Sequence, residues 1–149
     1  LNARSAYGTE LLSKHACRVV LTPHPKEFSR LVERPVKEVL ADPVGMAKEF
    51  AARYRVTVLL KNNRSVITDG ARVAINPTGS PSLAKGGSGD VLSGILVGTC
   101  ARGVAPFEAA CVASYLLGRA GEIAAREMGE YAPDPTDIIA CIAKAQQSL

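Results

Sequence analysis

The sequence predicts an α/β fold in which a mostly parallel sheet is flanked by helices. Strand-like and helix-like segments alternate in the first half of the chain, in the order strand, helix, helix, strand. An antiparallel hairpin follows, and the last third of the chain is helical. Alternation of this kind is typical of parallel sheets whose faces are covered by helices.

The first clear strand is RVVL at residues 18–21, and it leads directly into TPHPKEFSRLVER. There a threonine and two prolines precede a helical pattern of polar and apolar residues, which predicts a tight loop followed by a helix. A second helix is predicted over Pro43–Tyr54, where apolar residues recur at helical spacing. It runs into the β-branched segment RVTVLLK, which predicts the next strand.

Two short apolar segments in SVITDGARVAI flank Asp69 and Gly70. This dipeptide favours a two-residue hairpin turn, in which both central residues need a positive φ. Three helices are then predicted, over residues 87–102, Pro106–Met128 and residues 136–145, with Gly129 as a stop signal for the second. Either Asp134 or Thr136 caps the last helix. In these helices we expect alanines to face the core, together with apolar residues such as Val112, Leu116, Ile123, Ile139 and Ile142.

Length and composition favour one intracellular globular domain. The 149 residues are 47% hydrophobic and 21% charged, and no apolar stretch is long enough to cross a bilayer. The opening segment LNARSAYGTE lacks the features of a secretory signal, so a cytoplasmic location is expected. Cys17, Cys100, Cys111 and Cys141 form no CxxC pair and are expected to be reduced and mostly buried.

The net charge of +4 is spread along the chain without a basic run, and aromatic residues make up only 5%. A nucleic-acid partner is therefore not expected, and no membrane partner is expected either. With two histidines and scattered cysteines, the sequence also predicts no protein metal site.

The segment AKGGSGDVLS, residues 84–93, places glycines at the start of a predicted helix. We call residues 86–90, GGSGD, the glycine motif. Glycines let a backbone approach a ligand closely, and the amides at a helix start attract anions. A structural reading is also open, in which Gly86 and Gly87 form a turn and Asp90 is an ordinary acidic residue of the first helical turn. The functional reading assigns phosphate binding to the glycines and makes Asp90 the general base for an attacking hydroxyl.

Farther along this helix, Gly94 and Gly98 are expected to let another backbone pack closely. Asn76, Pro77, Thr78 and Gly79 form a lead-in loop before the glycine motif, and they either shape the site or only form a turn.

The stretch NPTGSPSLAKGGSGDVLSG resembles the signature of the NAD(P)H-hydrate dehydratases, which are relatives of the ribokinase-like small-molecule kinases. LTPHPKEFSRL is similar to the family's TPHPGE segment, and LLKNNRSVITDG is similar to its lysine-containing strand and nucleotide loop. GRAGEIAAREMGEY and TDII resemble its closing helices. The resemblance covers nearly the whole chain and implies the C-terminal part of a ribokinase-like domain.

The resemblance also implies roles for individual residues. The nucleotide-binding residues would be Lys61, Asn62, Asn63, Arg64, Ser65, Gly86, Gly87, Ser88 and Gly89. His24 and Asp90 would contact the hydrated nicotinamide substrate, with Asp90 as the catalytic residue. From the residues alone, His24 could be only a loop residue and Lys61 only a surface-seeking lysine at a strand end.

The implied reaction is the nucleotide-dependent dehydration of the damaged cofactors NADHX and NADPHX to NADH and NADPH. ADP is favoured over ATP as the cosubstrate, and Mg2+ is the expected companion of the phosphates. Two positions depart from the family pattern: Lys26 replaces a glycine, and Lys85 replaces the threonine before the glycine motif. Lys85 either reinforces phosphate binding or crowds the loop.

The largest departure is length. LNARSA resembles the residues that follow a strand in the middle of the family's domain, so residues 1–149 are expected to be a partial domain without its N-terminal half. The chain would then be a fragment, a truncation, or one of two chains that share the domain. An exposed sheet edge would favour oligomers or association with the missing half.

Two alternative functions are open. The first is a ribokinase-like kinase, which would use the same Asp90 and glycine motif but leave a stable phosphorylated product. The second is a nucleotide-binding fragment without activity of its own.

Overall fold

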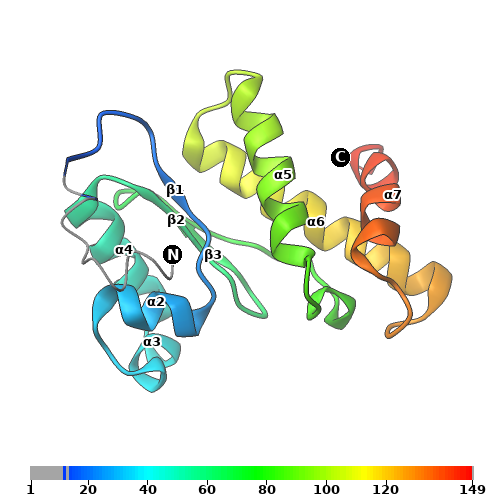
Figure 1. Ribbon diagram of the computed structural model, residues 1–149, viewed down its shortest axis with the longest axis horizontal. Helices are drawn as coiled ribbons and strands as arrows, with labels where there is room; N and C mark the ends of the chain where they lie inside the picture. Colours follow the sequence, from blue (N-terminus) through cyan, green and yellow to red (C-terminus); the bar gives the residue numbers. More distant parts are fainter. Residues whose placement is uncertain (1–11, 13, 149) are drawn as a thin grey trace. The chain divides into compact units, whose positions relative to one another are not determined.

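The computed structural model describes residue 12 and residues 14–148, and the opening segment LNARSA lies outside these described residues. The chain divides into two compact units, a first unit that ends at Ile75 and a second unit that begins at Asn76 (Figure 1). Each unit is considered by itself.

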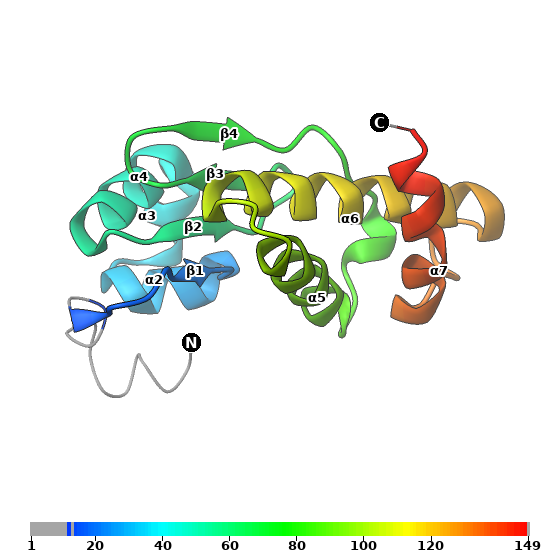
Figure 2. The ribbon, with the colours of Figure 1, turned by 90° about the horizontal axis from the view of Figure 1, so that it is seen from above.

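The first unit is built on a four-stranded sheet. Its strands, in spatial order, are β1 (Val20–Leu21), β2 (Thr57–Leu60), β3 (Val66–Thr68) and β4 (Val73–Ile75) (Figure 2). β1 and β2 are parallel, whereas β2 with β3 and β3 with β4 are antiparallel. The predicted α/β class and the hairpin are confirmed. The described part of the sheet is mixed, because it contains only one parallel pair.

Among the described residues of this unit, three helices accompany the sheet: α2 (Pro25–Val32), α3 (Val36–Ala41) and α4 (Pro43–Tyr54). The prediction for α4 is confirmed at both ends. Asp42 caps its start by accepting a hydrogen bond from the Gly45 amide at 2.8 Å, and Arg55 ends it with a φ of 53°. The short helix α3 was not predicted, and it starts without a side-chain cap.

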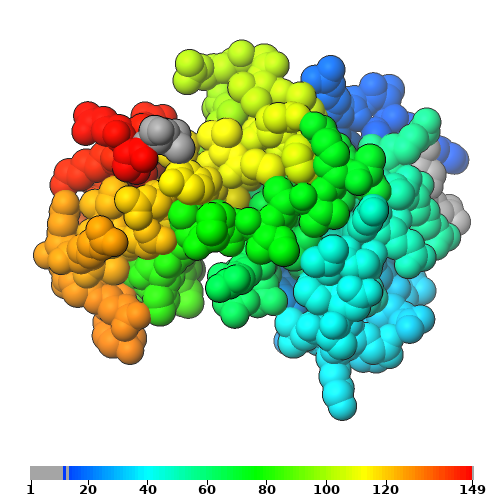
Figure 3. Space-filling model, turned by 180° about the vertical axis from the view of Figure 1, so that it is seen from behind, coloured from blue at the N-terminus to red at the C-terminus, as the bar shows by residue number. Residues whose placement is uncertain are grey.

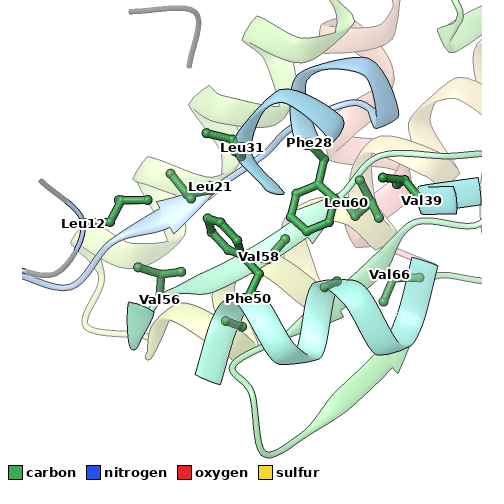
Figure 4. Packing of buried hydrophobic residues seen from close by; sticks show 12 residues of the cluster. Leu12, Leu21, Phe28, Leu31, Val39, Phe50, Val56, Val58, Leu60 and Val66 are labelled. Atoms are coloured by element: carbon green, nitrogen blue, oxygen red, sulfur yellow. The ribbon is translucent and has the colours of Figure 1, made fainter. Parts of the chain in front are cut away.

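The core of the first unit lies between these helices and β1 and β2 (Figure 4). Phe28 of α2 and Phe50 of α4 meet edge to face with ring centroids 5.4 Å apart. Val58 and Leu60 of β2 are almost fully buried in the same cluster. This packing fixes the position of the strand ends that carry candidate site residues.

The hairpin turn differs from the predicted two-residue turn. Thr68 pairs with Val73, so four residues separate the paired positions, and only Gly70 among them has a positive φ, at 93°. The Asp69 carboxylate accepts hydrogen bonds from the two backbone amides after Gly70 and stabilises the wider loop. A Cβ at Gly70 would lie 2.6 Å from backbone atoms of Ala52, so the loop can pack on α4 only with glycine here.

The second unit is helical, as predicted. It contains a short 3-10 helix, η2 (Pro81–Leu83), followed by α5 (Ser88–Ala101), α6 (Pro106–Met128) and α7 (Pro135–Gln146). The predicted bounds of α6 are confirmed at both ends, and Gly129 is its C-cap. Asp134 caps α7 by accepting hydrogen bonds from the amides of Thr136 and Asp137. Figure 3 shows α7 (red) lying against the later part of α6 (orange).

The buried side of α6 is made mostly of small residues, including Ala109, Ala113, Gly118, Ala120, Gly121 and Ala124. Leu116 is buried as predicted, but Val112 and Ile139 are 39% and 52% exposed. The prediction was wrong for these two residues because the alanines and glycines form the buried stripe of α6 and leave Val112 outside it. On α7, Ile138 rather than its neighbour Ile139 is fully buried.

All four cysteines are free thiols, which confirms that they are unpaired. Only Cys141 is buried, and Cys17 is exposed, so the expectation of mostly buried thiols was wrong. Burial, together with the nearby Glu127 carboxylate, raises the pKa of Cys141. Within the described residues, no helix combines the length and the apolar character needed to cross a bilayer.

Candidate functional site

In the first unit, two candidate segments lie at the same edge of the sheet. β1 and β2 are parallel, so their carboxyl ends point the same way, and they are followed by Thr22–His24 and by Lys61. The Lys61 amide donates a hydrogen bond of 2.8 Å to the Pro23 carbonyl oxygen, which ties the two segments together. Ligands of open α/β sheets bind outside the carboxyl ends of the strands, so this edge is suited to a ligand.

His24 has a structural role that the sequence interpretation missed. It is the N-cap of α2: its Nδ1 accepts a hydrogen bond from the Glu27 amide at 3.2 Å, and the Glu27 carboxylate accepts one from the His24 amide at 2.8 Å. The spacing of an N-cap residue and a glutamate three positions later is the signal of a capping box. With Nδ1 as an acceptor, a neutral ring carries its proton on Nε2, which lies 3.5 Å from Oε2 of Glu27 and is the ring nitrogen left to donate to a ligand.

Residues 62–65 form a turn between β2 and β3 that is stabilised by hydrogen bonds among its own residues. Asn62 Oδ1 accepts from the Asn63 amide at 2.9 Å, and Asn63 Oδ1 accepts from the Arg64 amide at 2.8 Å. Ser65 Oγ donates to the Asn62 carbonyl oxygen at 3.4 Å. The side-chain carbonyls shape the turn, and Arg64 stands exposed on it.

In the second unit, the glycine motif forms the start of α5. Gly87 is the N-cap with a φ of 92°, and no side chain caps the helix. A Cβ at this position would lie 2.7 Å from Cγ of Pro135, so only glycine fits both the backbone conformation and the space. Gly86 is exposed, and a Cβ there would meet no described atom within 4 Å.

Ser88 and Asp90 stand in the first turn of this helix. The Ser88 hydroxyl is buried and has no hydrogen-bond partner among the described residues. Buried hydroxyls are rarely left unpaired, so the Ser88 hydroxyl is a donor that the described residues do not use. Asp90 is exposed, and its amide donates to the Gly87 carbonyl oxygen at 2.9 Å.

The lead-in loop is fastened to α6 by its own polar side chains. Asn76 Nδ2 donates to the Ser114 carbonyl oxygen at 3.1 Å, and Thr78 Oγ1 donates to the Tyr115 carbonyl oxygen at 3.0 Å. Gly118 makes this approach possible, because a Cβ there would lie 2.7 Å from the carbonyl carbon of Thr78. The loop therefore does more than form a turn: it fixes the segment that leads to the glycine motif.

Two further contacts continue this attachment. The Gly79 amide donates to Oε1 of Glu122 at 3.0 Å, and Ser82 Oγ donates to the Gly121 carbonyl oxygen at 3.3 Å. Partial burial alone would raise the pKa of Glu122, but the hydrogen bonds from Gly79 and from the Arg119 guanidinium lower it below its usual value. The carboxylate is therefore held in its charged form at the base of the loop.

The expected role of Gly94 and Gly98 in close packing is not seen. Both are exposed, and a Cβ at either would meet no described atom within 4 Å. Close approach is instead provided by Gly118 and Gly121, where a Cβ would collide with Thr78 and Leu83.

The Lys85 side chain contacts main-chain carbonyls of the second unit. Its ammonium group donates to the Tyr131 carbonyl oxygen at 2.5 Å and to the Pro133 carbonyl oxygen at 2.8 Å. Both acceptors lie in residues 129–134, which we call the α6–α7 connection. Lys26, the other departure from the family pattern, is exposed on α2.

The candidate residues are thus gathered in two places. The first unit brings His24 close to Lys61 and the turn of residues 62–65, and the second unit holds the glycine motif with Asp90. In the part of the chain that the structure describes, no three histidine, cysteine, aspartate or glutamate side chains come together as a metal site.

The chain is similar to known proteins over most of its length. A family model described as NAD(P)H-hydrate dehydratase matches residues 3–144. A bifunctional NAD(P)H-hydrate repair enzyme from Moorella thermoacetica is 40% identical over 136 residues, which are 90% of this chain and 26% of that protein. An ADP-dependent (S)-NAD(P)H-hydrate dehydratase from Bacillus subtilis is 42% identical over 107 residues, 70% of this chain and 38% of the relative.

Solved structures agree. The ADP/ATP-dependent NAD(P)H-hydrate dehydratase from Bacillus subtilis, co-crystallised with ATP/Mg2+, matches with a TM-score of 0.84 and 32% identity. The match covers 92% of this chain and 52% of that one. A ribokinase-like superfamily protein from Enterococcus faecalis matches with a TM-score of 0.71 at 25% identity, over 87% of this chain and 44% of its own. The ribokinase-like fold is confirmed, and the chain spans about half the length of these structures.

Proposed function

Because the chain belongs to the NAD(P)H-hydrate dehydratase family, we propose that it carries the phosphate-binding and catalytic part of an enzyme that repairs hydrated nicotinamide cofactors. The substrates are NADHX and NADPHX, and the products are NADH and NADPH. The observation that carries this proposal is the glycine motif at the uncapped start of α5, followed in the same helical turn by the exposed Asp90.

The start of α5 is suited to an anion. The first amides of a helix have no partners within the helix, and the helix dipole places partial positive charge there. Here no side chain occupies these amides, a Cβ at Gly86 would meet no described atom within 4 Å, and the buried Ser88 hydroxyl has no hydrogen-bond partner among the described residues. We assign the nucleotide's phosphates to Gly86, Gly87, Ser88 and Gly89.

Asp90 is assigned the role of general base. The substrate hydroxyl gives its proton to the carboxylate as its oxygen attacks the terminal phosphorus, and the bond from that phosphorus to the remaining nucleotide breaks. The reduced ring nitrogen then donates its electron pair, the C–O bond breaks, and phosphate leaves. Loss of a proton from the adjacent ring carbon restores the reduced nicotinamide.

The first unit supplies the remaining contacts in this proposal. His24 binds the hydrate through Nε2, because Nδ1 is engaged by the Glu27 amide. Lys61 and the turn of Asn62, Asn63, Arg64 and Ser65 bind the nucleotide, which is supported by their place at the carboxyl end of β2.

ADP is the preferred cosubstrate in this proposal, with ATP as the alternative, since the Bacillus subtilis relative is named ADP-dependent. Mg2+ is proposed to bind together with the phosphates of the nucleotide. That fits the described residues, which offer no three-ligand cluster, because Mg2+ is commonly held by substrate phosphates, waters and one or two carboxylates. When bound, it would neutralise charge on the phosphates, and Asp90 is the carboxylate that the glycine motif itself contains.

We further propose that the chain acts together with the remaining half of the domain, or as an oligomer, and that it is inactive alone. The solved relatives are about twice as long as this chain. Within the described residues, β1 is an edge strand that pairs only with β2, and an unpaired edge favours addition of further strands. A cytoplasmic location is part of the same proposal, supported by the four free thiols.

The test is an assay on NADHX with ADP or ATP and Mg2+ that follows NADH absorbance and free phosphate together. Equal amounts of NADH and phosphate support the dehydratase, and addition of a separately expressed N-terminal half should raise the rate. A stable phosphorylated product without NADH would indicate a kinase. Nucleotide binding without any turnover, with and without the other half, would leave only a binding module and overturn the proposal.

His24 allows a test that separates capping from substrate binding. Asparagine is among the best N-cap residues but has no imidazole, so His24→Asn should keep the stability of the protein and raise KM for NADHX about tenfold. His24→Ala should raise KM similarly and also lower the free energy of unfolding by about 1 kcal/mol. Urea unfolding and steady-state kinetics on both variants provide the measurement. An unchanged KM in His24→Asn would leave His24 with its capping role alone.

A further inference from the structure

Lys85 joins two segments of the second unit that are far apart in sequence. It immediately precedes the glycine motif, and its ammonium group reaches the carbonyl oxygens of Tyr131 and Pro133 in the α6–α7 connection. Hydrogen bonds from a charged donor are stronger than those between neutral groups. Pro133 is fully buried, so one of the two acceptors belongs to a fixed part of the fold.

A second contact links the same two segments. Gly87, with its φ of 92°, leaves room for the ring of Pro135, the first residue of α7. Pro135 follows Asp134, whose carboxylate holds the amides of Thr136 and Asp137. Through Gly87, the glycine motif therefore packs against the start of α7, which the Asp134 cap stabilises.

We propose that Lys85 is a positioning residue: its ammonium group holds the α6–α7 connection against the glycine motif and so keeps the motif in the shape that binds phosphate. This inference rests on the proposed function for the phosphate itself. Two of the three N–H groups of the ammonium donate to protein carbonyls, and in this proposal it acts on the ligand through the backbone of the motif. The α6–α7 connection thereby influences the affinity for nucleotide without contacting the nucleotide itself.

The test compares Lys85→Met, which keeps most of the side-chain stem and removes the charge, with Lys85→Arg, which can still donate to both carbonyls. Lys48→Met, at an exposed position of α4, is the control. Hydrogen exchange of the free protein is followed at the amides of Asp90 and Val91, which donate to Gly87, and at those of Thr136 and Asp137. Affinity for ADP and for ATP is measured by calorimetry.

In Lys85→Met, exchange should accelerate in both segments and stay unchanged in β2 and β3, and the Kd for ADP and for ATP should rise by a similar factor of about ten. Lys85→Arg should return both properties to near the wild-type values. Weaker nucleotide binding with unchanged exchange would mean that Lys85 contacts phosphate directly, and it would overturn the proposal. Unchanged exchange and unchanged affinity would overturn it as well.

The exchange data also separate this inference from the proposed function. If the wild-type protein binds neither nucleotide, in the presence or absence of the N-terminal half, the proposed function fails. Exchange in the free Lys85→Met variant would still decide whether the ammonium group joins the two segments, since that measurement needs no ligand.

Discussion

Replacing Asp90 with asparagine should lower kcat about a thousandfold, because the amide cannot take the proton of the attacking hydroxyl. The Kd for nucleotide should change by less than about threefold, since the proposal assigns the phosphate contacts to Gly86, Gly87, Ser88 and Gly89 rather than to the Asp90 carboxylate. The measurement is single-turnover NADH formation together with calorimetric ADP binding, in whichever form of the protein turns over NADHX.

Glu49→Gln is the matched control, because Glu49 is an exposed carboxylate on α4 in the first unit. It should leave both kcat and nucleotide affinity unchanged. An Asp90→Asn variant that retains more than about a tenth of the wild-type kcat would remove Asp90 from the role of general base.

Gly118→Ala should be the most destabilising single-methyl change among those considered, with a loss of about 3 kcal/mol or more in the free energy of unfolding. The new Cβ would lie 2.1 Å from Thr78 Oγ1 and 2.7 Å from the Thr78 carbonyl carbon. A rotation of the hydroxyl relieves the first contact but also breaks its bond to the Tyr115 carbonyl oxygen. The second contact involves backbone and requires the lead-in loop to move away from α6.

Gly94→Ala provides the control for this change, because it adds the same methyl group to a helix where no described atom lies within 4 Å. It should stabilise the protein by about 0.5–1 kcal/mol, since alanine favours a helix more than glycine does. Urea unfolding followed by far-UV circular dichroism measures both variants. Equal stabilities for the two variants would show that Gly118 is not needed for the approach of the loop.

The helices and strands were predictable where the sequence carries strong local signals. Pro106 and Gly129 bound α6, and Asp42 with Pro43 starts α4, because caps and prolines act through adjacent residues. Helix α3 was missed because its six residues are too few to show a periodic pattern. The wider hairpin turn was missed because it depends on packing against Ala52, which no local signal reveals.

The residues of the candidate site were predictable from the sequence, but the contacts that position them in space were less so. The glycine motif is recognisable from its composition, and the capping box of His24 and Glu27 was readable from their spacing. The attachment of Lys85 to the α6–α7 connection joins residues 46 and 48 positions apart, so it depends on the fold. The same is true of Asn76 and Thr78, whose partners on α6 lie 38 and 37 positions away.

Four hydrogen bonds attach the lead-in loop and the following η2 to α6, and three of them share one chemical pattern. In these three the donors are the side chains of Asn76, Thr78 and Ser82, and the acceptors are main-chain carbonyls of the helix. The fourth runs from the Gly79 amide to the Glu122 carboxylate. Every amino acid supplies such a carbonyl, so exchange of Ser114 or Tyr115 for another residue leaves the acceptors in place. Ser114 and Tyr115 can therefore be exchanged without loss of an acceptor, whereas exchange of Asn76 or Thr78 removes a donor.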